Sequence, residues 1–335
     1  MGNSGGRRAK HFVVRNFYVD DGLTSVSTSE EAIALFRNTQ KMLAESNLRL
    51  HKIPSNSKTV MKAFPKKDHA EDLKDLDLGV DSLPVQHSLG LTWNLETDSF
   101  NFHVHQEEKP FMRMGVLSTV NSLYDPLGFL APVVVDWDTP LSIERQAEWN
   151  EWRCSLTTLE QLQIKRLYVP VSLTFTQKKE LCFFSDASTV AIGAVAYFKV
   201  VDSNNQCQVG FVMGKAKLAP CPAHTIPRLE LCAAMLAVEM YEMIRDEIDE
   251  EIDSVKFFTD SRIVLGYIYN VRKRFYVYIA NSVARIRKST NPDQCCYVNT
   301  NDNPADLATK AIPAERLQDV GFLDHNFYSR EMLKN

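Results

Sequence analysis

Residues 180–218 constrain the fold of this chain most strongly, because they carry strand-like runs in close succession. The segment "ELCFFSDASTVAIGAVAYFKV" is rich in aromatic and β-branched residues, which predicts a strand ending at Asp186, a turn and a second strand. The segment "VGFVMGKAKLA" predicts a third strand. A helix is expected next, because "IPRLELCAAMLAVEMYEMI" has Pro227 in its first turn and apolar residues at helical spacing. The apolar stripe consists of Leu229, Ala233, Leu236, Ala237, Met240 and Ile244.

Two further segments complete this second half, which begins near Lys179. The segment "SVKFFTDSRIVLGYIYN" predicts a strand, a turn and a helix, with Asp260 at the carboxyl end of the strand. In "DNPADLATK" we expect Asn303 as helix N-cap, Pro304 at the first helical position and Asp306 in the first turn. The second half therefore predicts a mixed sheet flanked by helices.

The first half predicts an α+β arrangement that starts with a hairpin. Residues 1–11 are expected to be a disordered tail, and Phe12–Val19 reads as a strand that turns at Asp20, Asp21 and Gly22 into "LTSVS". The following segment, "STSEEAIALFRNTQKMLAESNLRL", has capping residues and a helical apolar repeat.

The rest of the first half alternates loops, strands and a helix. The charged, aperiodic residues 65–83 predict an exposed loop, and "SLGLTWNLETDSFNFHV" predicts two short strands around a turn at Thr97 and Asp98. The segment "MGVLSTVNSLYDPLGFLAPVVVDWDTPL" starts as a helix that Pro126, Gly128 and Pro132 stop.

Composition limits the class of protein. A chain of 335 residues that is 44% hydrophobic and 24% charged is long enough to form two ordinary domains with buried cores. Its net charge is −4, so any site that binds a polyanion must be a local basic patch. The seven cysteines include no C-x-x-C pair, which favours reduced thiols and an intracellular protein, cytoplasmic or nuclear. No apolar run is long enough to span a bilayer, so no membrane partner is expected.

Four carboxylates stand at the ends of predicted elements beside apolar residues. They are Asp186, Glu230, Asp260 and Asp306. Singly, each can be a cap or a solvated turn residue. If they converge at one edge of a mixed sheet, they repel one another unless divalent cations neutralise them. Two Mg²⁺ or Mn²⁺ ions held there could bridge a phosphodiester, which predicts metal-assisted hydrolysis of a nucleic acid backbone.

The segments "FFSDAS", "IPRLELCAA", "FFTDS" and "NPADLATK", in this order, resemble the type 1 ribonuclease H domain in the Pol polyprotein of BEL/Pao-type LTR retrotransposons. The resemblance implies that the four acids are its metal-binding catalytic residues. In the first half, "NFYVDD" looks like the catalytic hairpin of reverse transcriptase, "LGLTWNLETDSF" like its primer-grip region, and "VLSTVNSLYDPLGFLAPV" like a thumb or connection segment.

This resemblance implies a division of the chain. Residues 12–110 would be the C-terminal part of a reverse transcriptase palm with the primer grip but without fingers, and residues 111–178 a shortened thumb- or connection-like helical segment. Residues 179–312 would be the ribonuclease H-like domain, and residues 313–335 a C-terminal tail. The implied partners are an RNA–DNA hybrid and other Pol-derived segments, namely upstream fingers and palm and a downstream integrase.

The chain also departs from that family. Asp20 and Asp21 form only part of a polymerase site, because the third catalytic Asp and the fingers lie upstream in the family, so we expect no autonomous DNA synthesis. Val135 runs directly into Asp136, where the family has a helical stretch. No His lies between Asp260 and Asp306, where many ribonucleases H carry one, and His224 is read as a loop residue.

The name of the Pao family is also attached to an aspartic peptidase. Such an enzyme needs a D-T-G or D-S-G loop, and neither tripeptide occurs, so protease chemistry is rejected.

A basic segment between two of the acids is a candidate nucleic-acid contact. Its basic residues are Arg272, Lys273, Arg274, Arg285, Arg287 and Lys288. Basic groups neutralise phosphates and interleaved aromatics can pack on sugars or bases, although a solvated amphipathic helix explains the same pattern. The expected function is hydrolysis of the RNA strand of RNA–DNA hybrids; the alternative is an inactive retroelement remnant that at most binds nucleic acid.

Overall fold

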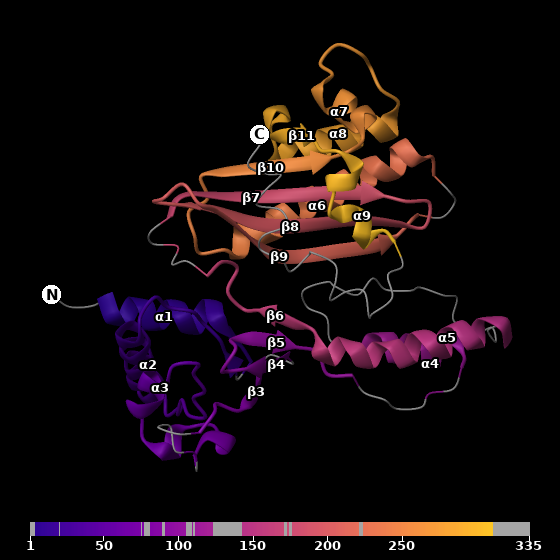
Figure 1. Ribbon diagram of the computed structural model, residues 1–335. Helices are drawn as coiled ribbons and strands as arrows, with labels where there is room; N and C mark the ends of the chain where they lie inside the picture. Colours follow the sequence, from indigo (N-terminus) through magenta and orange to yellow (C-terminus); the bar gives the residue numbers. More distant parts are fainter. Residues whose placement is uncertain are drawn as a thin grey trace. The chain divides into compact units, whose positions relative to one another are not determined.

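The computed structural model describes residues 4–19, 21–74, 76, 81–88, 91–104, 109, 111–122, 143–170, 173, 176–220 and 224–310. The chain divides into two compact units (Figure 1). The first unit comprises Met1–His103 with Gln163–Arg166, and the second comprises Val104–Leu162 with Leu167–Asn335.

Residues 4–16 form a helix, so the predicted disordered tail is wrong over residues 4–11 and the predicted strand is wrong over residues 12–16. Helix α1 (Ser4–Asn16) buries Ala9 and Phe12, which are three residues apart and so share a helical face. The Phe12 ring lies 6.2 Å from that of Phe36 on helix α2 (Ser29–Ala44). Packing between the two helices thus outweighs the strand propensity of "FVV".

The hairpin survives in shortened form. Strands β1 (Phe17–Tyr18) and β2 (Asp21–Gly22) pair antiparallel, with Tyr18 opposite Asp21. Val19 has a φ of 57°, which is unusual for a β-branched residue and is imposed by the tight turn.

Helix α2 begins as its capping residues predict, because the Thr28 side chain accepts a hydrogen bond from the Glu31 N–H. After α3 (Lys58–Lys62), the expected exposed loop contains two short 3₁₀ turns, η1 (Lys66–Asp68) and η2 (Glu71–Leu73). Its exposure was wrongly predicted for His69 and Leu73, which are buried. The His69 Nε2 lies 2.9 Å from the Met61 carbonyl, so a polar residue completes this core.

A four-stranded sheet closes the first unit in the order β3-β4-β5-β6. Its strands are β3 (Val85–Ser88), β4 (Leu91–Asn94), β5 (Ser99–Asn101) and β6 (Gln163–Lys165). The predicted turn between β4 and β5 is confirmed, with Asp98 at a φ of 49°. Arg166 donates to both Asp98 carboxylate oxygens, at 2.7 and 2.8 Å, which ties β6 to that turn.

The second unit starts with helices α4 (Arg113–Ser122) and α5 (Ile143–Ser155), followed by the 3₁₀ turn η3 (Leu156–Gln161). The predicted helix start near Met114 is confirmed. The proline stop and the junction of Val135 with Asp136 lie outside the described residues.

A five-stranded mixed sheet forms the centre of the second unit, in the order β11-β10-β7-β8-β9 (Figure 1). The three predicted strands are confirmed as β7 (Thr176–Ala187), β8 (Ala191–Asp202) and β9 (Cys207–Leu218), and they pair antiparallel in this order. Strand β10 (Ser254–Thr259) pairs parallel with β7 and with β11 (Cys295–Tyr297), which was too short to predict.

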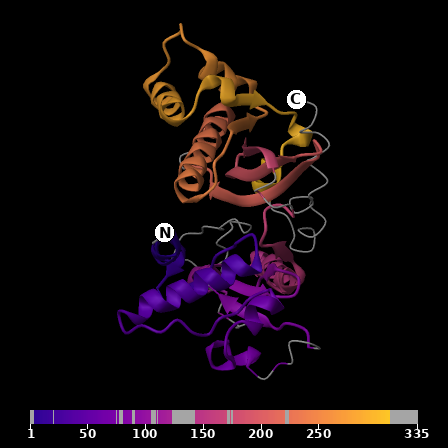
Figure 2. The same ribbon diagram turned by 90° about the vertical axis from the view of Figure 1, so that its left-hand side faces the viewer.

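Helices cover both faces of this sheet. Helix α6 (Ile226–Glu247) packs on one face and buries its whole predicted apolar stripe. Helices α7 (Arg262–Tyr269) and α8 (Val277–Ser289) add to the same core. Figures 1 and 2 show the short helix α9 (Ala305–Ala308) on the opposite face, where Ala305 packs with Phe184 and Tyr197. The 3₁₀ turns η5 (Pro292–Gln294) and η6 (Thr300–Asp302) flank β11.

Among the described residues, none of the helices has the length and apolar character needed to cross a bilayer.

Candidate metal centre

Two aspartates meet because strands β7 and β10 run side by side in the same direction. Ser185 on β7 is paired with Thr259 on β10, so the next residue of each chain segment, Asp186 and Asp260, stands at the same edge of the sheet. This is the convergence that the sequence predicted for carboxyl ends of strands.

Glu230 reaches the same edge from α6. Pro227 opens the helix, and Leu229 and Ala233 bury their side chains against the sheet. Glu230 is only 8% exposed, and Asp186 is 6% exposed. One ligand oxygen from each of Asp186, Glu230 and Asp260 lies within 4.8 Å of the others. We call these three residues the acidic trio.

The acidic trio is electrostatically unfavourable when every member is ionised. Burial, with the charges of Asp186 and Asp260, raises the pKa of Glu230 to about 8. Burial also raises the pKa of Asp186, with further contributions from Asp260 and Asp306 that a hydrogen bond from Thr309 partly offsets. Within the described part of the chain, the buried Glu230 Oε2 has no hydrogen-bond partner.

A hard divalent cation fits this donor set. All three groups offer carboxylate oxygens, which Mg²⁺ prefers, and a cation would remove their mutual repulsion and engage the orphaned Glu230 oxygen. The trio therefore has the chemistry of a metal site.

Asp306, the fourth predicted acid, lies nearby but outside the trio. It sits in the first turn of α9, and its charge contributes to the raised pKa of Asp186. Its carboxylate is paired with the Lys310 ammonium at 2.5 Å, one helical turn later. The structure thus brings three of the four predicted acids together and places the fourth beside them in an ion pair.

Two threonines that the sequence did not single out hold members of the trio. The Thr309 hydroxyl donates to Asp186 Oδ2 at 2.6 Å, and the Thr300 hydroxyl donates to Asp260 Oδ2 at 2.7 Å. For Thr309, the sequence signal that could have indicated a role near the acids was its position three residues after Asp306 in "DLATK". Thr300 carried no signal, since it becomes a neighbour of Asp260 only through the pairing of β10 with β11.

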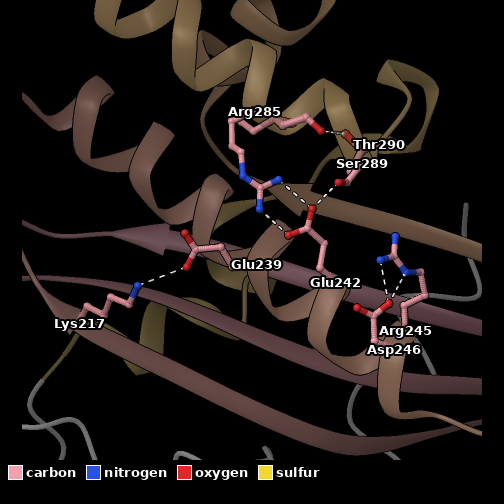
Figure 3. Close-up of polar contacts among 9 residues, drawn as sticks. Lys217, Glu239, Glu242, Arg245, Asp246, Arg285, Ser289 and Thr290 are labelled. Carbon is pink, nitrogen blue, oxygen red and sulfur yellow. Dashed lines mark hydrogen bonds and ion pairs between the residues drawn. The ribbon is translucent and has the colours of Figure 1, made fainter.

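The six basic residues of the predicted nucleic-acid segment fall into two groups. Arg272, Lys273, Arg274 and Lys288 are exposed. Arg285 instead forms a two-pronged ion pair with Glu242 of α6, and Arg287 donates to the carbonyls of Ile268 and Asn270 (Figure 3 for Arg285). These two guanidinium groups thus already hold helices together, whereas phosphate binding by the six residues stays a prediction.

Three of the exposed basic residues, Arg272, Lys273 and Arg274, lie in the loop between α7 and α8. The Asn270 side chain accepts from the N–H groups of Arg272 and Lys273 and donates to the Lys273 carbonyl, which fixes the turn. Tyr276, at the end of this loop, is 86% exposed.

The remaining candidates, Asp20, Asp21 and His224, are not members of the trio. Asp21 is exposed on β2 in the first unit, and Asp20 lies outside the described residues. His224 is in the loop before α6, as expected, with its ring 6.0 Å from that of Tyr278.

Comparison with known proteins agrees with this arrangement. Residues 112–261 match the family described as Pao retrotransposon-like RNaseH-like domain. That span includes the acidic trio and ends before Asp306. A comparison with curated protein sequences finds no match.

Solved structures with some similarity include RNase H1 from the halophilic archaeon Halobacterium salinarum NRC-1. It is 15% identical, with 42% of this chain and 98% of that chain covered and a TM-score of 0.27. The LC11-RNase H1 structure, solved with an RNA/DNA hybrid, is 15% identical, with coverages of 39% and 92% and a TM-score of 0.28. The foamy viral protease-reverse transcriptase, solved with double-stranded DNA, is 10% identical, with coverages of 88% and 47% and a TM-score of 0.44.

The family match spans the strands and the helix that build the acidic trio. Over residues 112–261 the chain is thus similar to the family described as Pao retrotransposon-like RNaseH-like domain, and this span includes most of the mixed sheet and helix α6.

Proposed function

We propose that this protein hydrolyses the RNA strand of RNA–DNA hybrids endonucleolytically, with two Mg²⁺ or Mn²⁺ ions held by Asp186, Glu230, Asp260 and Asp306. The observation that carries the proposal is the trio itself: three carboxylates converge within 4.8 Å, and one buried oxygen among them has no hydrogen-bond partner among the residues that the structure describes. Such a cluster is costly without a cation, and the family description supports ribonuclease H chemistry.

The residues of the chain have distinct roles in this proposal. Divalent ions held by these carboxylates would supply an activated water and charge stabilisation for the leaving oxygen of the phosphodiester. Asp186 and Asp260 hold their ligand oxygens in fixed directions, because each carboxylate is anchored by a threonine hydroxyl. Glu230 brings an oxygen from the helix side, and Asp306 joins once it leaves Lys310.

The substrate is proposed from charge and shape. Four exposed basic side chains lie in the same unit as the trio and can neutralise phosphates of the nucleic acid backbone. They belong to Arg272, Lys273, Arg274 and Lys288. Recognition of an RNA–DNA hybrid would depend on its helical shape and the 2′-hydroxyl groups rather than on base sequence. We expect products with 5′-phosphate and 3′-hydroxyl ends.

Residues 12–110 are proposed to derive from a reverse transcriptase palm and primer grip, and residues 111–178 from its thumb or connection. Asp20 and Asp21 would then be part of a polymerase site that this chain does not complete, with other Pol-derived segments as partners. The alternative for the whole protein is an inactive remnant that binds nucleic acid at most, which the Lys310–Asp306 ion pair and the absent loop histidine favour.

A cleavage assay with purified full-length protein separates the two. Hybrid labelled on the RNA strand, hybrid labelled on the DNA strand, and RNA duplex are each incubated with Mg²⁺, with Mn²⁺ or with EDTA. The proposal predicts metal-dependent cuts in the RNA strand of the hybrid alone. Binding of the hybrid without cleavage under every metal condition would support the remnant instead.

A further inference from the structure

The Thr309 hydroxyl joins the strand that bears one acid to the helix that bears another. It lies 2.6 Å from Asp186 Oδ2 and 3.0 Å from the Asp306 carbonyl, and the residue is only 7% exposed. A hydroxyl has one proton to donate, and the shorter contact to a charged acceptor is the stronger hydrogen bond. The proton is therefore directed to Asp186.

The position of α9 does not depend on this hydrogen bond. At its start, Asn303 Nδ2 donates to the Ser185 carbonyl on β7 at 3.0 Å, and at its end Ser188 Oγ donates to the Thr309 carbonyl at 3.2 Å. Between them, Ala308 packs over Gly193, where an added Cβ would lie 2.8 Å from the Ala308 Cβ. Loss of the hydroxyl alone should leave the helix in place.

The hydroxyl acts on the orientation of the Asp186 carboxylate. Asp186 lies opposite Gly193 on β8, beneath the end of α9, and its side chain is nearly buried. A hydrogen bond to one oxygen fixes the plane of the carboxylate while leaving acceptor positions for a cation. Thr300 gives Asp260 a similar contact, but Thr300 is exposed, so its hydroxyl can be replaced by water.

We propose that Thr309 is a positioning residue of the metal centre, which holds the Asp186 carboxylate in the orientation that binds a divalent cation and links it to the helix carrying Asp306. The inference rests on the proposed function for its consequence in catalysis, whereas its effect on metal binding can be measured without any substrate. Partners that orient metal ligands typically change affinity by about 10–100-fold when removed.

The test compares Mn²⁺ affinity, measured by calorimetry on metal-free full-length protein, among three variants. Thr309→Val removes the hydroxyl and keeps the shape, and Thr309→Ser keeps the hydroxyl. Thr290→Val is the matched control, because Thr290 is equally buried and its hydroxyl donates only to the Ile286 carbonyl within α8, beside the Glu242–Arg285 pair (Figure 3).

Thr309→Val should weaken Mn²⁺ binding by about tenfold, with Thr309→Ser and Thr290→Val within about twofold of the wild type. In the cleavage assay, kcat at saturating hybrid should fall for Thr309→Val and recover for Thr309→Ser. Equal Mn²⁺ affinity in Thr309→Val and wild type would overturn the inference, as would a Thr309→Ser variant that binds as weakly as Thr309→Val.

Two further outcomes are distinguishable. If the wild type binds Mn²⁺ but cuts no hybrid, the proposed function fails and the Thr309 comparison still stands on affinity. If Thr309→Val does not fold by circular dichroism, Thr309→Ala measured below its own melting temperature replaces it, with the same two criteria. A wild type that binds no Mn²⁺ overturns the inference and the metal centre together.

Discussion

At the scale of single residues, Glu230 shows best how the fold prepares a metal centre. The residue is 8% exposed, and one carboxylate oxygen has no hydrogen-bond partner within the described residues. Burial and two neighbouring aspartates raise its pKa to about 8, so the metal-free protein holds a proton there that the unfolded chain releases at much lower pH. Ionising the buried Glu230 carboxylate costs free energy in the folded state, whereas in the unfolded chain water solvates the charge.

This linkage predicts how stability changes with pH in the absence of metal. Because the folded pKa of Glu230 lies above its ordinary value of 4.5, the contribution of Glu230 to stability is fully present below about pH 4.5 and is lost as pH rises through about 8. Glu230→Gln cannot ionise, so at pH 9 in EDTA it should be more stable than the wild type by on the order of 2 kcal/mol. Denaturant unfolding at pH 5, 7 and 9 measures the difference.

Glu239→Gln is the matched control, since Glu239 lies on the same helix and pairs with Lys217 at the surface (Figure 3). It should follow the wild type at each pH. Parallel pH profiles for Glu230→Gln and the wild type would contradict the assigned origin of the raised pKa.

At the scale of elements, an ion pair between Arg285 and Glu242 joins α8 to α6. The basic residues of α8 did not reveal this pair in the sequence, because they were read as phosphate contacts. Arg285 Nη1 donates to Glu242 Oε1 at 2.7 Å, its Nη2 donates to the other oxygen, and Ser289 donates to the same carboxylate (Figure 3). The hydrogen bonds from Arg285 and Ser289 lower the pKa of Glu242 to about 2. Arg285 is thus a helix-packing residue.

A double-mutant cycle on Arg285→Met and Glu242→Gln should give a coupling of about 1 kcal/mol in unfolding free energy, because the pair is two-pronged but partly exposed. Since the folded pKa of Glu242 is lowered, this coupling should persist above about pH 4.5 and vanish as pH falls toward 2. Lys217→Met with Glu239→Gln, an exposed pair, should show much weaker coupling. Equal coupling in the two cycles would argue against the special role of Arg285.

The loop between α7 and α8 carries the phosphate-binding prediction. Replacing Arg272, Lys273 and Arg274 together by Gln should flatten the plot of log affinity for hybrid against log salt by about two to three units of slope. Fluorescence anisotropy at several salt concentrations measures this slope. Arg285→Met is the control, because it also removes a positively charged side chain but outside this loop. An unchanged slope in the triple variant would remove this loop from the interface.

The two halves of the chain differ in how far their elements follow from local sequence. Strands β7 to β10 and helix α6 could be predicted, because long apolar runs and Pro227 specify them locally. Helix α1 could not, because Phe12 favours a helix only through its packing with Phe36 on α2. Strands β6 and β11 were missed since three-residue strands depend on partners distant in the chain.

The candidate site shows the same limit. Asp186 and Asp260 were predictable from their places at strand ends, and Glu230 from the start of its helix. The pairing of Asp306 with Lys310, and the hydrogen bonds from Thr300 and Thr309, depend on side-chain directions that spacing leaves undetermined.

At the scale of the whole molecule, the two proposed sites lie in different units: Asp21 of the proposed polymerase remnant is in the first unit, and the acidic trio is in the second. The unit that contains Asp21 and the unit that contains the acidic trio each have their own buried cluster. Only the second unit is covered by the family match over most of its sheet. The activity of the full chain should therefore depend on the trio and be indifferent to Asp21.

The catalytic role of the acidic trio is tested most directly by single-turnover cleavage of an RNA–DNA hybrid by the full chain with Asp186→Asn, compared with Asp21→Asn. The wild type and Asp21→Asn should cleave the RNA strand in a Mg²⁺-dependent reaction, and a folded Asp186→Asn protein should cleave it at least about a thousandfold more slowly. Cleavage by Asp186→Asn at the wild-type rate, or its loss in Asp21→Asn alone, would contradict the central claim.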